Sequence, residues 1–85
     1  MTTVEIYTKE HCTFCARAKA LLTHKNVKYK EIHVDQDPKA LETMVSRAKG
    51  RRTVPQIFIG DKAIGGYDDL YALEQQGKLD TLLNQ

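Results

Sequence analysis

The sequence predicts a single α/β domain over residues 1–85 in which parallel strands are joined through helices. The chain is 85 residues long and 41% hydrophobic, which suffices for one small core but not for two. Strand-like and helix-like stretches follow one another in the order strand, helix, strand, helix, strand, strand, helix. The first three of these suit a right-handed crossover between parallel strands.

The first half of the chain supplies this crossover. Residues 3–8 alternate and are rich in β-branched and aromatic side chains, which predicts a strand. Strong helix formers from 12 to about 24 predict a helix that Asn26 ends. A second strand is expected over 27–34, although its alternation slips once near Glu31. The side chains expected to be buried from the first two elements are Val4, Ile6, Ala16, Leu21 and Leu22.

The next helix has both of its ends marked. Asp37 can cap it, and Pro38 can take the first helical position, where the missing N–H costs nothing. Gly50 ends it. The apolar residues that recur at helical spacing are Leu41, Met44, Val45 and Ala48.

A hairpin is expected after this helix. Residues 53–59 predict a strand, and Gly60-Asp61 predicts a two-residue turn of the II′ kind into a short strand over 62–64. Pro55 marks the entry of the first hairpin strand, because proline cannot donate to a sheet ladder. A cis bond there would turn the Val54 backbone outward and leave its polar groups free for a partner.

The C-terminal part is expected to be helical. A helix over 70–76 would be capped by Asp68 or Asp69 and stopped by Gly77. A short last segment would dock on the core through Leu79, Leu82 and Leu83.

Cys12 and Cys15 indicate the chemistry. They are the two cysteines of the chain and stand where the first strand gives way to a helix. The free N–H groups and macrodipole of a helix start favour a thiolate at Cys12, and Lys9 adds positive charge. The i, i+3 spacing brings Cys15 within disulfide reach. Two cysteines are too few for a disulfide framework, so we expect a redox centre.

Other chemistries have weaker support. Zinc needs four ligands, and only His11, His24 and His33 are available to join the cysteines, so no metal site is expected. We place His11 on an exposed turn, outside the catalytic set. One local basic cluster is interpreted as a solvated helix end, with anion binding as the alternative. This cluster consists of Arg47, Lys49, Arg51 and Arg52.

Charge and hydropathy restrict the partners. A net charge of +2 is no signature of nucleic-acid binding. The first residues lack the features of a secretory signal, and no apolar stretch reaches the length of a membrane span. We therefore expect a cytoplasmic monomer with neither nucleic-acid nor membrane partners.

Three motifs together resemble the glutaredoxins over nearly the whole chain. They are C-T-F-C at 12–15, T-V-P at 53–55 and G-G-Y-D-D at 65–69. The resemblance implies a thioredoxin fold, with a four-stranded mixed sheet in the order 2-1-3-4 and helices on both faces. It implies a glutathione-dependent thiol-disulfide oxidoreductase of the dithiol type, in which Cys12 is the nucleophile and Cys15 the resolving thiol. Glutathionylated and disulfide-containing proteins would be its substrates, with ribonucleotide reductase as one candidate.

The resemblance also implies a glutathione site. Lys9 and the basic or polar residues before T-V-P would face the glycine carboxylate, and the Val54 backbone would pair with the cysteine moiety as an added strand does. Tyr67 and Asp68 would hold the γ-glutamyl end at a helix N-terminus. The residues expected around glutathione are Lys9, Thr13, Phe14, Thr53, Val54, Pro55, Gly66, Tyr67 and Asp68.

One departure keeps a second function open. The commonest family motif is C-P-Y-C, whereas Thr13 here retains a backbone N–H and adds a hydroxyl, and Phe14 lacks the phenol hydroxyl. Some glutaredoxins without the active-site proline bind a [2Fe-2S] cluster between two protomers, through the first cysteine and two glutathiones. The resemblance therefore allows an alternative function, that of a carrier for a glutathione-ligated [2Fe-2S] cluster.

Overall fold

A computed structural model describes residues 2–84, and its elements follow the expected order. The elements are β1 Val4–Thr8, α1 Thr13–His24, β2 Tyr29–His33, α2 Pro38–Arg47, β3 Gln56–Ile59, β4 Lys62–Gly65, α3 Tyr67–Gln75 and α4 Leu79–Leu83.

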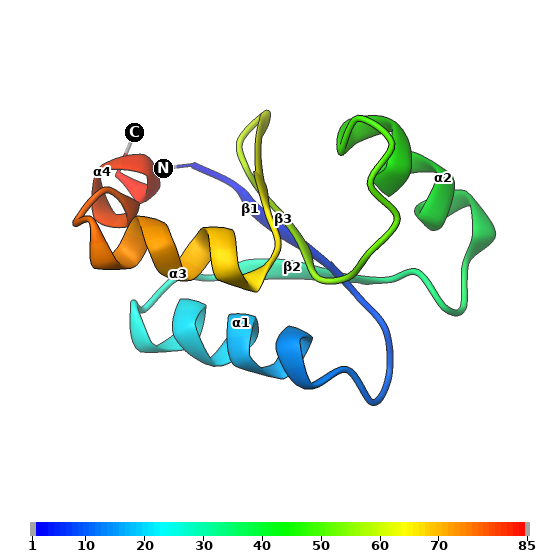
Figure 1. Ribbon diagram of the computed structural model, residues 1–85, viewed down its shortest axis with the longest axis horizontal. Helices are drawn as coiled ribbons and strands as arrows, with labels where there is room; N and C mark the ends of the chain where they lie inside the picture. The colour runs from blue at the N-terminus through cyan, green and yellow to red at the C-terminus, as the bar shows by residue number, and fades with distance from the viewer. Residues whose placement is uncertain (1, 85) are drawn as a thin grey trace.

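The strands form one mixed sheet in the order β2-β1-β3-β4. β1 and β2 are parallel, while β3 is antiparallel to both β1 and β4, so the expected four-stranded arrangement is confirmed. Figure 1 shows α1 and α3 side by side, with α2 set apart from them. Gly60 has the left-handed φ of 60° that a glycine-led turn between β3 and β4 requires.

Helices cover both faces of the sheet, because alternate strand residues feed two separate cores. The first core joins strand residues to α1, α3 and α4 and contains Val4, Ile6, Ala18, Leu22, Ile57, Ile59, Leu70 and Leu79. The second joins the other sheet face to α2 and contains Tyr7, Val34, Met44, Ala48 and Phe58. The expected burial of Val4 and Ile6 is confirmed.

The irregular pattern of β2 follows from this two-sided burial. Tyr29 packs against the first core, whereas Ile32 and Val34 belong to the second, so the apolar face of the strand changes along its length. Glu31 lies opposite Ile6 in the parallel register, which places it on the α1 side of the sheet. A charged side chain therefore stands under α1 near the carboxyl ends of the strands.

Two local expectations are wrong. Ala16 is exposed, because the buried face of α1 is defined by Cys15, Ala18 and Leu22 at helical spacing. The strand after the second helix begins at Gln56 rather than at residue 53, and the cis bond between Val54 and Pro55 precedes it.

The start of α3 also differs from the expectation. Its first residue is Tyr67 and its N-cap is Gly66, so neither Asp68 nor Asp69 is the cap. Asp69 instead lies in the first turn and accepts a hydrogen bond from the Gly66 N–H at 2.9 Å. A hydrogen bond from the N-cap N–H to an acidic side chain three residues later is one of the two hydrogen bonds of a capping box.

Other helix ends are as expected. The Asp37 carboxylate accepts from the Lys39 N–H at 3.0 Å with Pro38 in the first turn, which confirms the predicted cap of α2. Beyond α1, Asn26 has a φ of 60° and ends the helix as predicted. Within residues 2–84, no helix is both long and apolar enough to cross a membrane.

Candidate functional site

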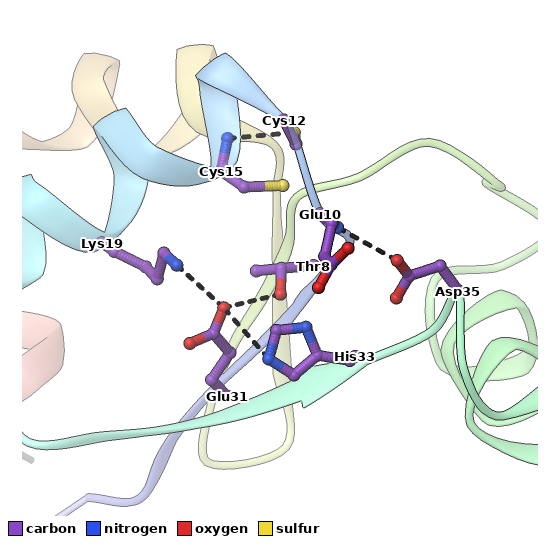
Figure 2. A network of polar contacts seen from close by, with 8 residues as sticks. All are labelled: Thr8, Glu10, Cys12, Cys15, Lys19, Glu31, His33 and Asp35. Carbon is purple, nitrogen blue, oxygen red and sulfur yellow. Dashed lines mark hydrogen bonds and ion pairs between the residues drawn. The ribbon is translucent and has the colours of Figure 1, made fainter.

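Cys12 lies at the N-cap of α1 and is half-buried, while Cys15 lies one turn further on and is only 2% exposed. The Cys15 backbone N–H donates to Cys12 Sγ at 3.2 Å (Figure 2). Both cysteines are free thiols. A sulfur in this position satisfies an otherwise unpaired N–H of the helix start, and a thiolate does so more strongly than a thiol.

Cys15 is held as a thiol. Burial raises its pKa to about 12, and a hydrogen bond with Cys12 raises it as well. Backbone hydrogen bonding from Lys9 and the charge of Lys19 act in the opposite direction. The two cysteines therefore differ in accessibility, with Cys12 open to a reactant and Cys15 behind it.

A groove of about 160 Å³ brings seven of the expected glutathione-site residues together. Its lining consists of Phe14, Arg51, Thr53, Val54, Pro55, Gly66, Tyr67, Asp68 and Asp69. The groove thus joins the second residue of α1, the segment before β3 and the start of α3. Lys9 and Thr13 do not line this groove and lie instead in a second hollow beside the cysteines.

The groove contains charges of both signs. Arg51 Nη1 lies 3.5 Å from Asp69 Oδ2, and both side chains are about half exposed. Asp68 and the N-terminus of α3 adjoin them. A ligand that carries carboxylates and an ammonium group would find complementary groups here.

Asp69 was not among the expected binding residues, and Arg51 was expected only as one of the basic residues before T-V-P. Arg51 was grouped with a basic cluster interpreted as a solvated helix end, but the cluster divides in the fold. Arg47 lies over the Phe58 ring at 4.1 Å and pairs with Glu5 at 3.0 Å, whereas Arg51 turns to the groove. Sequence proximity alone does not separate these two roles.

An aromatic row extends from the groove. Phe14 is 49% exposed and its ring lies 6.2 Å from that of Tyr67. Tyr67 in turn stacks on Tyr71 at 5.8 Å, and Arg17 lies 5.4 Å from the Phe14 ring. Phe14 therefore packs between Tyr67 and Arg17 and remains half exposed.

The second hollow, of about 690 Å³, borders both cysteines. It is lined by Lys9, Glu10, His11, Cys12, Thr13, Cys15, Ala16, Lys19, Glu31 and His33. The Glu31 carboxylate accepts from Thr8 Oγ1 at 2.7 Å and from Lys19 Nζ at 2.9 Å (Figure 2). His33 Nε2 lies 3.8 Å from the same carboxylate. The one sequence feature that indicated this network was the break near Glu31 in the alternation of the second predicted strand.

The loop that presents Cys12 is held at its base. The Glu10 N–H donates to Asp35 Oδ2 at 3.1 Å, which ties the loop after β1 to the loop after β2. His11 is exposed on this turn, with a left-handed φ of 57°. Across residues 2–84, no three or more side chains of the metal-ligating types converge on one point.

Comparison with known proteins identifies the family. The glutaredoxin family model matches residues 4–64. Glutaredoxin 3 of Escherichia coli is 55% identical over 83 residues, which cover 98% of this chain and 99% of the relative. The solution structure of a Brucella melitensis glutaredoxin, 53% identical, superposes with a TM-score of 0.85 over 98% of this chain and 89% of its own.

A crystal structure of a buckwheat glutaredoxin-glutathione complex, 34% identical, superposes with a TM-score of 0.87 over 98% of this chain and 77% of the other. These matches agree with the C-T-F-C motif at the start of α1 and with the sheet order. The chain therefore belongs to the glutaredoxin family of thiol-disulfide oxidoreductases.

Proposed function

We propose that the protein reduces glutathione mixed disulfides and protein disulfides, with Cys12 as the nucleophile and Cys15 as the resolving thiol. The observation that carries the proposal is the half-buried Cys12 at the N-cap of α1, close to a groove with Arg51 and Asp68 in its lining. The buckwheat relative forms a complex with glutathione, which supports glutathione as the co-substrate here.

The groove suggests how glutathione is held. Its γ-glutamyl end would lie at the N-terminus of α3, where backbone N–H groups receive the carboxylate and Asp68 receives the ammonium. Its cysteine moiety would pair with the Val54 backbone, and its glycine carboxylate would face Thr53 and Arg51. Lys9, in the second hollow, would act beside Cys12 rather than on the glycine carboxylate.

Reduction of a glutathione mixed disulfide needs one cysteine. The Cys12 thiolate attacks the glutathionyl sulfur, an S–S bond forms between them, and the substrate leaves as a thiolate that takes up a proton. A second glutathione thiolate then attacks the glutathionyl sulfur, which releases glutathione disulfide and returns Cys12 to its thiolate.

Reduction of a protein disulfide uses both cysteines. Cys12 first forms a mixed disulfide with one substrate sulfur and releases the other as a thiol. The Cys15 thiolate then attacks Cys12 Sγ, which frees the substrate as a dithiol and leaves a Cys12–Cys15 disulfide. Two glutathione molecules reduce that bond and become glutathione disulfide.

A glutathione-coupled assay on a small glutathionylated disulfide tests the assignment. Cys12→Ser is expected to lose turnover completely, because it removes the attacking sulfur. Cys15→Ser is expected to keep turnover of this substrate but to lose reduction of protein disulfides. Retained turnover in Cys12→Ser would refute the assignment, and loss of both activities in Cys15→Ser would refute the single-thiol route.

A cluster carrier is the second candidate, since a solved structure 53% identical to this chain is described as "Metal Binding of Glutaredoxins". Cys12 supplies one accessible thiolate, but residues 2–84 bring no further ligand set to it. A [2Fe-2S] cluster would need thiolates from a second copy and from glutathione. Anaerobic purification distinguishes the two functions: a brown dimer with visible absorption supports the carrier, and a colourless monomer with turnover supports the reductase.

A further inference from the structure

The second hollow contains an organised set of charges that the glutathione groove does not use. Thr8, Glu31 and His33 all project from the α1 side of the sheet, because Thr8 lies opposite His33 and Ile6 opposite Glu31 in the parallel register. Lys19 meets them from α1, one turn beyond Cys15. Figure 2 shows both cysteines over this set.

Lys19 is fixed in place by its partner. Its ammonium lies 2.9 Å from Glu31 Oε2, and the hydroxyl of the fully buried Thr8 donates to the same oxygen at 2.7 Å. Burial opposes ionisation of Glu31, but the hydrogen bonds from Lys19 and Thr8 outweigh it and lower the carboxyl pKa. The hydrogen bond to Glu31 raises the pKa of Lys19. Both charges are therefore present at neutral pH.

The resolving step needs a charge at this place. Cys15 must become a thiolate to attack Cys12, yet burial disfavours that form. Once Cys12 is in a mixed disulfide it has no thiol with which to bond Cys15, so burial remains as the main opposing effect. Two groups favour the thiolate: the Lys9 backbone, through a hydrogen bond, and the positive charge of Lys19, which lines the same hollow as Cys15.

We propose that Lys19, held by Glu31 and Thr8 in the second hollow, is the positioning residue whose ammonium stabilises the Cys15 thiolate for the resolving step. This inference rests on the proposed function. The Cys15 S–H gives its proton to water in the hollow, which opens to solvent and has room for it. The thiolate then bonds to Cys12 Sγ, the bond from Cys12 to the substrate breaks, and the departing substrate thiolate takes up a proton.

Other charged and titratable groups also face the hollow, and they contribute to the pH dependence of the resolving rate. The loop after β1 contributes Lys9, Glu10, His11 and Cys12, and β2 contributes Glu31 and His33. Tyr29 on β2 also acts electrostatically on Lys19. His33 Nε2 lies 3.8 Å from the Glu31 carboxylate, and histidine is the side-chain type that acts as a switch near physiological pH, so His33→Gln belongs in the measurement as a separate variant.

The test measures the resolving step alone. Reduced protein is mixed rapidly with a small glutathionylated disulfide, and quenched samples are analysed by mass for glutathionylated Cys12 and for the Cys12–Cys15 disulfide between pH 5.5 and 8.5. The variants are Lys19→Gln, Lys19→Arg and Glu31→Gln. Lys25→Gln is the matched control, because Lys25 closes α1 and lies 2.9 Å from Glu74 and from Asp80, in ion pairs that do not involve the cysteines.

We expect Lys19→Gln to slow formation of the Cys12–Cys15 bond about three- to tenfold at pH 7, since tenfold corresponds to one pKa unit of a thiol. Its plot of log rate against pH should run parallel to that of the parent protein but be displaced to higher pH. Lys19→Arg should preserve the rate. Glu31→Gln should slow the step less than Lys19→Gln does, because the ammonium remains and the Gln carbonyl can still accept its hydrogen bond.

Four outcomes would overturn the inference. They are Lys19→Gln no slower than Lys25→Gln, Glu31→Gln as slow as Lys19→Gln, an equal loss of single-thiol turnover when Lys19→Gln is added to Cys15→Ser, and a His33→Gln variant that shows the same displacement to higher pH. The second would mean that the ion pair acts only through the fold. If His33→Gln displaces the plot of log rate against pH as Lys19→Gln does, the effect is assigned to His33 rather than to Lys19. Failure of the parent protein to form glutathionylated Cys12 would refute the proposed function itself and is thus distinguishable from these.

Discussion

Gly65, at the end of β4, occupies a position where a side chain has neither the conformation nor the room it needs. Its φ is +112°, and an added Cβ would collide with the Asp69 carboxylate and lie 2.8 Å from Arg51 Nη1. These are the two charged residues that pair at 3.5 Å in the lining of the proposed glutathione groove. Gly65 therefore maintains the shape of the groove without contacting a ligand through a side chain.

Gly65→Ala is expected to lower the free energy of unfolding by about 2–3 kcal/mol, the sum of a left-handed Cβ penalty and the displacement of Asp69. Gly77→Ala is the matched control, because Gly77 has a φ of +71° with open space around its Cβ. It should lose only about 1 kcal/mol. Equal losses in urea denaturation would contradict the steric part of this account.

Three of the helices end in the same way, and one ending has an unfavourable residue. Beyond α1, α2 and α3, the left-handed positions are occupied by Asn26, Lys49 and Gly77. After α2, the Gly50 N–H donates to the Val45 carbonyl at 2.8 Å and the Lys49 N–H to the Ser46 carbonyl at 3.4 Å, which is the Schellman pattern. Lys49 adopts a φ of 56° that a lysine disfavours.

Lys49→Gly should therefore stabilise the protein by about 0.5–1 kcal/mol, since relief of the left-handed strain exceeds the added entropy of the unfolded chain. The melting temperature should rise by several degrees, at roughly 4–8 °C per kcal/mol for a domain of this size. Asn26→Gly is the comparison, and its gain should be smaller because asparagine already tolerates this conformation. A fall in melting temperature for Lys49→Gly would contradict the strain assignment.

For helices and strands, the sequence predicted which elements form better than it predicted the residues at which they begin and end. Asp37 with Pro38 was recognisable because a cap and its first turn are adjacent in the chain. The start of α3 was misplaced because Gly66 caps without a side chain, and the acidic residue that completes the box lies three residues inside the helix. Burial of Ala16 was wrongly expected because composition does not show which face of α1 meets the sheet.

For the molecule as a whole, the pairing of distant segments determines both the site and its response to acid. The pKa of Glu31 is lowered in the folded protein, so its carboxyl binds a proton less readily there than in the unfolded chain. The stability it contributes is therefore complete above the ordinary glutamate value of about 4.3 and is lost as the pH falls through the lower folded value.

Glu31→Gln should lower the free energy of unfolding at pH 7 by about 1–2 kcal/mol, toward the lower end for hydrogen bonds to a charged group because the Gln carbonyl can still accept one. The difference from the parent protein should shrink as the pH falls below 4, because the parent then loses the same charge. Urea denaturation curves at pH 7, 5 and 3 check this. A difference that stays constant across the range would show that the effect comes from packing rather than ionisation.

The candidate site could be predicted only where its residues are local in sequence. Cys12 and Cys15 follow from one motif at a strand-to-helix junction. The network of Thr8, Lys19 and Glu31 joins β1, α1 and β2, and it requires the parallel register that linear patterning does not contain. The sequence likewise does not distinguish the role of Arg51 from that of Arg47, because only the fold separates these two residues.

The hydrogen bond from the Cys15 N–H to Cys12 Sγ links helix formation to electron transfer. This cap on α1 is strongest when Cys12 is a thiolate and weaker when the sulfur is neutral in a disulfide. In a thermodynamic cycle, any free energy that the cap adds to the reduced protein alone must appear as an equal change in the reduction potential, about 30 mV for each 1.4 kcal/mol. The first turn of α1 is therefore part of the redox couple, and a substitution that loosens it would shift the potential in the negative direction without touching either sulfur.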